Sequence, residues 1–276
     1  MQKFAQDSGV PLVAGPWLGE IAFELLYWLP FLQWVVAEFP TLRQRMVVVS
    51  RGGAGTWYQD IAWRYFDLFE LFTMQEFREH FPKFIKQTPR YRDYERLQYP
   101  KAESDVVELV RQQLGCQRVN VLQPSEMYVS FKFLEKTDPH WISKCYRRLP
   151  APTLTGLDLS LPRYYVAVRF YNNLSLPMTD AHHEFVRSTI QYLSAEIPVV
   201  LLTTGAQYDL KHKDFPVELS SSVLAVREFM TPSNNLAIQS AVLGNARAFC
   251  GNYGGLSFLP PYYDCPVFAV FGNACA

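Results

Sequence analysis

Residues 246–255 read ARAFCGNYGG and are followed by LSFL at 256–259. The apolar residues predict a strand. Three glycines, Gly251, Gly254 and Gly255, predict a turn whose backbone N–H groups are not covered by side chains. A short helix is expected next, and VFAVF at 267–271 predicts a second strand. Such a unit is a right-handed parallel crossover, and free amides at a helix start favour an anion. The segment therefore predicts a parallel α/β sheet and a phosphate-bearing ligand.

The same alternation of apolar runs and helical periodicity extends over the rest of the chain. Strands are predicted at 10–14, 46–50, 119–122, 164–169 and 198–202. Helices are predicted at 21–39, 58–72 and 106–114, after an N-cap at Asp180, and from Ser233 or Asn234 to Gly244. We therefore expect an α/β protein with two Rossmann-like parallel-sheet domains facing a cleft.

The domain boundary is expected in a segment rich in proline and turn formers, 149–162. The helical and strand patterns restart beyond it. The prediction is an N-terminal domain at 1–158 and a C-terminal domain at 159–276.

Composition restricts the classes of partner. The 276 residues carry a formal net charge of zero, so no global field attracts nucleic acid, and none is expected as a partner. Five cysteines without a Cys-x-x-Cys pair favour a reducing compartment, and the N-terminus shows no secretory signal. We expect a cytoplasmic protein. The apolar stretch 21–39 contains Glu24, Pro30 and Glu38, which favours a buried helix kinked at Pro30 over a membrane span.

One segment, 78–101, mixes basic and aromatic residues. Its basic residues are Arg78, Lys83, Lys86, Arg90, Arg92, Arg96 and Lys101. Two interpretations stay open: a solvated helical face or loop, and a surface that contacts lipid headgroups or an anionic glycan at the inner membrane face.

Residues 235–273 and 15–20 resemble glycosyltransferases of the GT-B architecture, in particular heptosyltransferases and Kdo transferases. The first segment is similar to their order of helix, strand, glycine turn, helix and strand, although Tyr253-Gly254 stands where those enzymes have Asp-Ser. The second is similar to their glycine loop with its acidic residue. The resemblance implies two Rossmann-like domains and a sugar nucleotide held mainly by the C-terminal one.

Glycosyl transfer requires a base for the acceptor hydroxyl and positive charge for the leaving phosphate. Glu20, after Gly19, is the expected base; its alternative role is to stabilise a helix dipole. Glu24 lies one turn further and is either the base or a buried carboxylate paired with an arginine. Arg169, at the end of a predicted strand, is expected to bind phosphate, with a structural ion pair as its alternative.

The remaining predicted site residues line the two substrates. Those on the donor side are Thr203, Thr204 and Gly205 for the nucleoside, the turn Gly251, Asn252, Tyr253, Gly254 and Gly255 for the phosphates, and Asn172. Tyr253 is also expected to stack on or cover the donor sugar. Gly19, Arg51 and Gly52 are expected to face the acceptor, with a surface salt bridge as the alternative for Arg51.

The chain has no Asp-x-Asp motif, so neither a metal nor a bound cofactor is expected, and the sugar nucleotide would be a co-substrate. The leading hypothesis is a metal-independent glycosyltransferase acting on a glycan or lipid-linked acceptor in surface polysaccharide biosynthesis. The alternatives are a sugar-nucleotide epimerase and a non-catalytic sugar-nucleotide or glycan-binding module.

Overall fold

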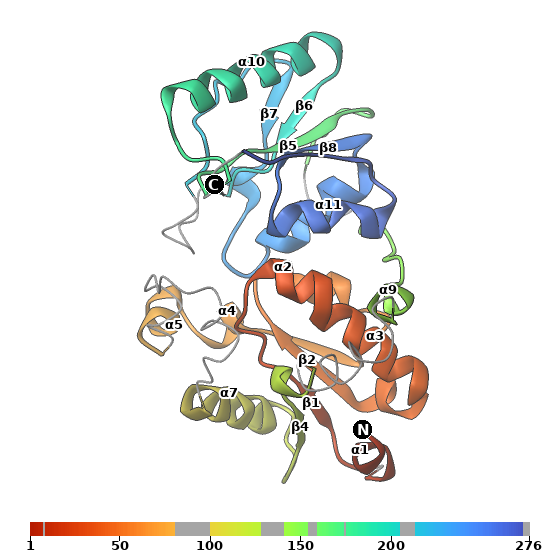
Figure 1. Ribbon diagram of the computed structural model, residues 1–276. Coiled ribbons are helices and arrows are strands. Elements are labelled where there is room, and N and C mark those ends of the chain that lie inside the picture. The colour runs from red at the N-terminus through yellow and green to blue at the C-terminus, as the bar shows by residue number, and fades with distance from the viewer. Residues whose placement is uncertain are drawn as a thin grey trace. The chain divides into compact units, whose positions relative to one another are not determined.

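The computed structural model describes residues 1–7, 9–80, 100–127, 141–153, 159–173, 175–204 and 213–272. It divides into two compact units, Met1–Arg147 (unit 1) and Arg148–Ala276 (unit 2). Each is an α/β unit built on one all-parallel sheet, which confirms the predicted fold class of two Rossmann-like domains (Figure 1). Residue 158 lies outside the described residues, so the predicted ranges 1–158 and 159–276 stay predictions, as does the cleft.

Unit 1 contains a four-stranded sheet with the order β3-β2-β1-β4. Its strands are β1 Leu12–Ala14, β2 Met46–Ser50, β3 Arg64–Asp67 and β4 Asn120–Leu122. All five residues of β2 are buried, as expected for a β-branched run in a sheet that is covered on both faces. β2 and β3 lie on one side of β1 and β4 lies on the other, so the order in which the chain adds strands reverses between β1 and β4.

The helical elements that the structure describes in unit 1 are short apart from two. They are α1 Gln2–Gln6, α2 Ile21–Phe23, the π-helical η1 Glu24–Trp28, α3 Leu29–Glu38, the 3₁₀ helices η2 Pro40–Arg45 and η3 Ala54–Trp57, α4 Leu68–Leu71, α5 Met74–His80, α7 Pro100–Gln113 and α9 Trp141–Cys145. Val106 and Val110 of α7 pack in one core with Val13, Val47 and Val49 of the sheet.

The stretch Ile21–Glu38 is continuous helix with a π-helical segment, η1, at its centre. The N–H of Leu29 donates to the carbonyl of Glu24, five residues earlier, and η1 ends just before Pro30. Pro30 has no N–H to offer the carbonyl of Leu26, and the Tyr146 hydroxyl donates to that carbonyl at 2.6 Å. Among the described residues this is the one helix long and apolar enough to cross a membrane; half of it is buried inside the protein, as in a core helix.

The predicted helix at 58–72 is wrong. Residues 64–67 form β3, which pairs in parallel with β2, and only Leu68–Leu71 are α-helical. Hydrogen bonding to the buried neighbouring strand overrides the local helical spacing of the apolar residues, because aromatic residues such as Tyr65 and Phe66 are equally suited to a strand.

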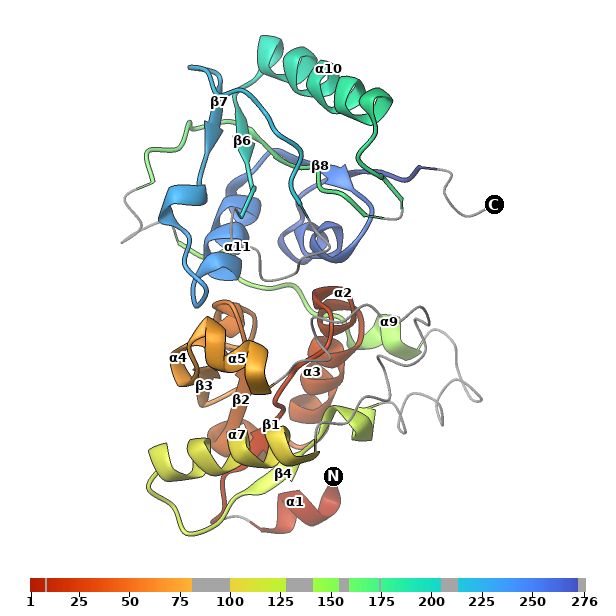
Figure 2. The ribbon, with the colours of Figure 1, turned by 90° about the vertical axis from the view of Figure 1, so that its left-hand side faces the viewer.

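Unit 2 contains a five-stranded sheet with the order β7-β6-β5-β8-β9. Its strands are β5 Val166–Arg169, β6 Val199–Leu201, β7 Val223–Ala225, β8 Ala248–Asn252 and β9 Val267–Val270. The helix α10, Asp180–Glu196, lies on one face of the sheet and α11, Asn235–Asn245, lies on the other (Figures 1 and 2). The parallel pairing of β8 with β9 confirms the predicted strands around the glycine turn.

Two details of unit 2 differ from the prediction. Thr179, and not Asp180, is the N-cap of α10, since its side chain accepts a hydrogen bond from the N–H of His182. The short helix expected after the glycine turn is a pair of 3₁₀ helices, η6 Gly255–Phe258 and η7 Pro260–Tyr263; a third, η5 Arg227–Phe229, follows β7. Pro260 and Pro261 lack the N–H groups that a longer α-helix would use.

Candidate functional site

In unit 2, the order in which the chain adds strands to the sheet reverses between β5 and β8. From β5 the chain moves to β6 on one side, and from β7 it crosses to β8 on the other side. Open parallel sheets bind ligands at the carboxyl ends of the strands where such a reversal occurs. Arg169, the last residue of β5, lies there in register with Gly251 of β8. The predicted donor residues of these two strands are therefore brought together.

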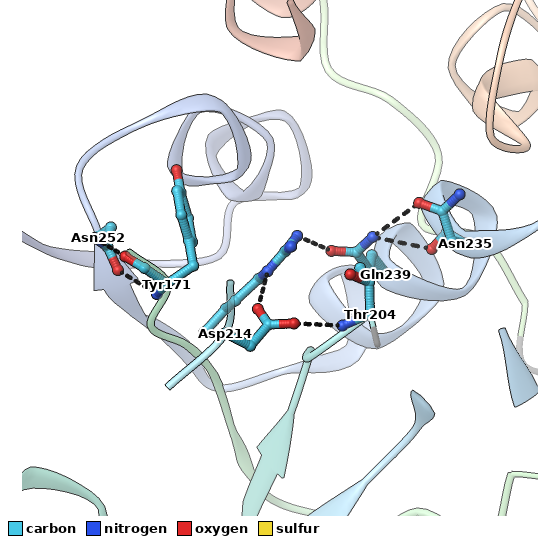
Figure 3. A network of polar contacts seen from close by, with 7 residues as sticks. Tyr171, Thr204, Asp214, Asn235, Gln239 and Asn252 are labelled. Atoms are coloured by element: carbon cyan, nitrogen blue, oxygen red, sulfur yellow. Dashed lines mark hydrogen bonds and ion pairs between the residues drawn. The ribbon is translucent and has the colours of Figure 1, made fainter. Parts of the chain in front are cut away.

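Arg169 belongs to a largely buried polar network at the carboxyl end of this sheet, of which Figure 3 labels Thr204, Asp214 and Gln239. Its Nε atom lies 3.2 Å from Oδ1 of Asp214, and its Nη1 atom donates to Oε1 of Gln239 at 3.0 Å. Oδ2 of Asp214 accepts a hydrogen bond of 3.0 Å from the N–H of Thr204. The arginine side chain is 12% exposed and also lies over the ring of Tyr171, at 5.2 Å from its centroid. The guanidinium plane is thus fixed on several sides.

This network engages two of the three guanidinium nitrogens of Arg169. Nε and Nη1 are engaged, whereas Nη2 of Arg169 has no hydrogen-bond partner among the residues that the structure describes. The alternative of a structural ion pair is present, through Asp214. Phosphate binding by Arg169 would use Nη2 and stays a prediction.

Asn252, the last residue of β8, ties the loop after β5 to the sheet. Its side chain accepts from the N–H of Tyr171 at 2.9 Å and donates to the carbonyl of Tyr171 at 2.8 Å. It also donates to Oδ1 of Asn173 at 3.2 Å. The side chain of Asn252 therefore has a structural function, which sequence reasoning, focused on its backbone N–H, did not anticipate.

In the glycine turn, two N–H groups that were expected to bind phosphate are already hydrogen-bonded, and two glycines are in close contact with neighbouring residues. The N–H of Tyr253 donates to the carbonyl of Val270, and the N–H of Gly254 donates to Oγ of Ser257. A Cβ atom on Gly251 would lie 2.2 Å from the carbonyl oxygen of Arg169, and one on Gly254 would lie 2.4 Å from the Tyr171 hydroxyl. Close packing alone therefore explains these two glycines, and phosphate binding by the turn stays a prediction.

The other predicted donor residues occupy nearby loops. The side chain of Asn172 accepts from the N–H of Met178, which is a turn contact. Thr203 and Thr204 directly follow β6, and Gly205 lies outside the described residues. Asp214 and Gln239 were missed: Asp214 lies in a segment without periodicity, and Gln239 resembles any other polar residue of a helix.

In unit 1 the predicted acceptor-side residues also come together. Arg51 directly follows β2, and its guanidinium donates to the carbonyls of Trp17 at 3.3 Å and Gly19 at 2.6 Å. The loop before α2 is therefore anchored to the carboxyl end of the sheet. Glu20 is the N-cap residue of α2 and is partly exposed. Gly52 follows with a positive φ of 74°, a conformation that glycine adopts readily.

Glu24 is completely buried at the carboxyl end of the same sheet. Its Oε1 atom accepts hydrogen bonds from Ser50, the last residue of β2, at 2.5 Å and from the Tyr58 hydroxyl at 2.7 Å. Its Oε2 atom has no partner among the described residues. Burial raises the pKa of Glu24 to about 7, although the charge of Arg51 and the two hydroxyls act in the opposite direction. Two hydroxyls thus donate to Glu24, and Arg51 acts on it through its charge.

A second buried carboxylate, Asp67, was missed because it lies inside the wrongly predicted helix. It is the N-cap of α4 and accepts from the N–H of Phe69 at 2.9 Å, the N–H of Gly53 at 2.6 Å and the Tyr65 hydroxyl at 2.9 Å. Burial raises its pKa, while the backbone hydrogen bonds lower it. Through its hydrogen bond from the N–H of Gly53, Asp67 supports the loop after β2.

Among the described residues no three His, Cys, Asp or Glu side chains are grouped so as to hold a metal ion, and metal independence stays a prediction. No protein-family model, curated protein or solved structure matches the chain. The two parallel α/β sheets are consistent with a Rossmann-like, GT-B-like architecture, and the case for a function rests on the residues at their carboxyl ends.

Proposed function

We propose that the protein is a metal-independent glycosyltransferase of the GT-B type that moves a sugar from a sugar nucleotide to a glycan or lipid-linked acceptor. The observation that carries the proposal is the position of Arg169 at the β5/β8 reversal, with Nη2 available and the guanidinium held by Asp214 and Gln239. The resemblance of residues 235–273 and 15–20 to heptosyltransferases and Kdo transferases supports the same reaction class.

On the donor side, the reaction breaks the bond between the anomeric carbon and a phosphate oxygen. Negative charge grows on that oxygen as it leaves, and a prearranged guanidinium stabilises it without having to reorganise. Asp214 supports this function because it orients the guanidinium, but its charge also repels the phosphate. The net positive potential at Nη2 is consequently lower than that of an unpaired arginine.

On the acceptor side, the attacking hydroxyl must lose a proton. Glu20 is partly exposed and lies next to the loop that Arg51 anchors, so it is the carboxylate that an acceptor reaches. Glu24 has a pKa of about 7, which suits a base at neutral pH, but it is buried. We assign the base to Glu20 and keep Glu24 as its alternative. We also propose that the reaction belongs to surface polysaccharide biosynthesis at the cytoplasmic side of the inner membrane. Contact of segment 78–101 with lipid headgroups is part of this proposal, with a solvated face or loop as its alternative, and residues 81–99 of that segment lie outside the described residues.

The proposal is tested by measuring the release of nucleoside diphosphate from a panel of sugar nucleotides in EDTA, with and without glycan acceptors. We expect release that depends on the acceptor and is lost in Arg169→Gln. Conversion of the donor without an acceptor would instead identify an epimerase. Binding without any turnover would identify a binding module, and the proposed activity would be wrong.

A further inference from the structure

Three aromatic side chains gather at the carboxyl ends of β8 and β9. Tyr253 directly follows β8, Phe271 directly follows β9, and Phe258 lies at the end of η6. The ring of Tyr253 packs edge to face against Phe258, with centroids 5.4 Å apart, and against Phe271, with centroids 5.8 Å apart. We call these three residues the aromatic cluster.

The aromatic cluster is unusually exposed for its size. Tyr253 is 49% exposed and Phe271 is 56% exposed. Side chains this large usually bury most of their surface, and exposed ones that pack on each other beside polar groups are typical of ligand sites. The cluster also lies at the edge of the sheet where α/β proteins bind ligands.

Two chains of contacts connect the aromatic cluster to Arg169. Gly254, next to Tyr253, packs against the Tyr171 hydroxyl, and the ring of Tyr171 lies under the guanidinium of Arg169. On the other side, the N–H of Gly272, next to Phe271, donates to the carbonyl of Ser175 at 2.8 Å.

Ser175 continues this second connection. Its hydroxyl donates to Oδ1 of Asn173 at 2.8 Å, and the same Oδ1 accepts from Asn252. The aromatic cluster is therefore connected to Arg169 through Tyr171, and to Asn252 through Ser175 and Asn173, all within unit 2. Engaging both places requires a ligand that has a charged part and an apolar face.

We propose that the aromatic cluster is the subsite for the sugar ring of the donor, with Tyr253 and Phe271 packing against the C–H face of the ring while Arg169 binds the diphosphate. The inference rests on the proposed glycosyltransferase function and adds the contact that recognises the sugar. A hexose ring presents C–H groups on its faces and hydroxyls around its rim, so aromatic rings bind it by a face.

The test compares each sugar nucleotide with the same nucleotide lacking the sugar. The probes for calorimetric titration are UDP-glucose with UDP, GDP-mannose with GDP, ADP-glucose with ADP, CDP-glucose with CDP and dTDP-glucose with dTDP. For the pair that binds the wild-type protein, Tyr253→Ala is expected to weaken binding of the sugar nucleotide about tenfold and to leave binding of the free nucleotide unchanged. Phe271→Ala is expected to act in the same direction.

Two further variants make the outcome specific. Tyr253→Phe keeps the ring and is expected to bind the sugar nucleotide like the wild type. Tyr192→Ala removes an aromatic side chain of α10 that is 74% exposed and outside the aromatic cluster, and is expected to change neither affinity. Thermal unfolding checks that each variant is folded, and Phe271→Ala serves as the second test if Tyr253→Ala is not.

The inference is overturned if Tyr253→Ala and Phe271→Ala weaken both members of the pair equally, or neither. In that case the proposed function stands, since the wild-type protein binds the donor. If the wild-type protein binds none of the probes, the proposed function fails and this inference with it, independently of Tyr253.

Discussion

The hydroxyl of Ser50 donates a hydrogen bond of 2.5 Å to Oε1 of Glu24 and joins the carboxyl end of β2 to the start of the π-helical segment. The Tyr58 hydroxyl donates to the same oxygen. Both hydrogen bonds favour the ionised carboxylate, yet burial outweighs them and raises the pKa to about 7. Unit 1 therefore contains a buried acid that titrates near neutral pH, and its stability must depend on pH.

We predict that Glu24 destabilises the folded protein as the pH rises. The folded protein holds this proton up to about pH 7, whereas the unfolded chain releases it near pH 4.5, so the contribution present below pH 4.5 is lost as the pH rises through 7. A difference of this size corresponds to about 3 kcal/mol. Urea unfolding at pH 5 and pH 8 should show a smaller loss of stability in Glu24→Gln than in the wild type.

The exposed carboxylate Glu79 of α5 provides the matched control. Glu79→Gln should keep the pH dependence of the wild type. If Glu24→Gln also keeps it, Glu24 does not titrate near neutral pH in the folded protein.

Removal of one hydroxyl should raise the pKa of Glu24 further. Tyr58→Phe takes away a donor to Oε1, which stabilises the ionised form. The carboxyl carbon of Glu24, followed by ¹³C NMR, should titrate at a higher pH in this variant. Tyr146→Phe is the control, because the Tyr146 hydroxyl donates to the carbonyl of Leu26 and not to Glu24. An equal midpoint in both variants would mean that Tyr58 does not stabilise the carboxylate.

Gly251 should not tolerate a side chain. A Cβ atom there would lie 2.2 Å from the carbonyl oxygen of Arg169, in the neighbouring strand, so Gly251→Ala forces β5 and β8 apart. We expect a loss of about 1–3 kcal/mol in the free energy of unfolding. Thermal unfolding measures this loss. Gly9→Ala, where no atom lies within 4 Å of the added Cβ, should lose far less free energy of unfolding. Equal stability of the two variants would contradict the packing of the glycine turn.

Asp214→Asn should strengthen the binding of anions at Arg169. The asparagine keeps the shape of the side chain, but it no longer neutralises the guanidinium or repels a phosphate. Its single oxygen serves either the N–H of Thr204 or Nε of Arg169, so the guanidinium is held less firmly. We expect affinity for the nucleoside diphosphate that binds the wild type to rise on the order of tenfold in calorimetric titrations at low salt. Weaker binding would show that orientation by Asp214 matters more than its charge.

Much of the fold could be predicted because its signals are local. The fully buried run 46–50 and the strands around the glycine turn are continuous apolar segments between turn residues. The strand β3 was missed because its aromatic residues fit helical spacing, and only pairing with β2 decides between the two. The strand β7 has three residues after a run of serines, which is too short for a periodic signal.

The candidate site was predictable only in part, because it depends on contacts between distant segments. Arg169 could be placed at the end of a strand, but its partners come from residues 45 and 70 positions further along the chain. Glu24 could be placed on a helix, but its hydroxyl donors lie 26 and 34 residues away. No spacing rule connects such residues, since the topology of the sheets brings them together.

The most direct test of the central claim is a calorimetric titration of sugar nucleotides into the wild-type protein and into Arg169→Gln, with Arg187→Gln as the control. Arg187 is an exposed arginine of α10 that pairs with Glu184. We predict that at least one sugar nucleotide binds the wild type and Arg187→Gln equally, and that Arg169→Gln weakens it by at least about tenfold. Equal binding by all three proteins, or no binding of any uridine, guanosine, cytidine, adenosine or thymidine donor to the wild type, would contradict the account.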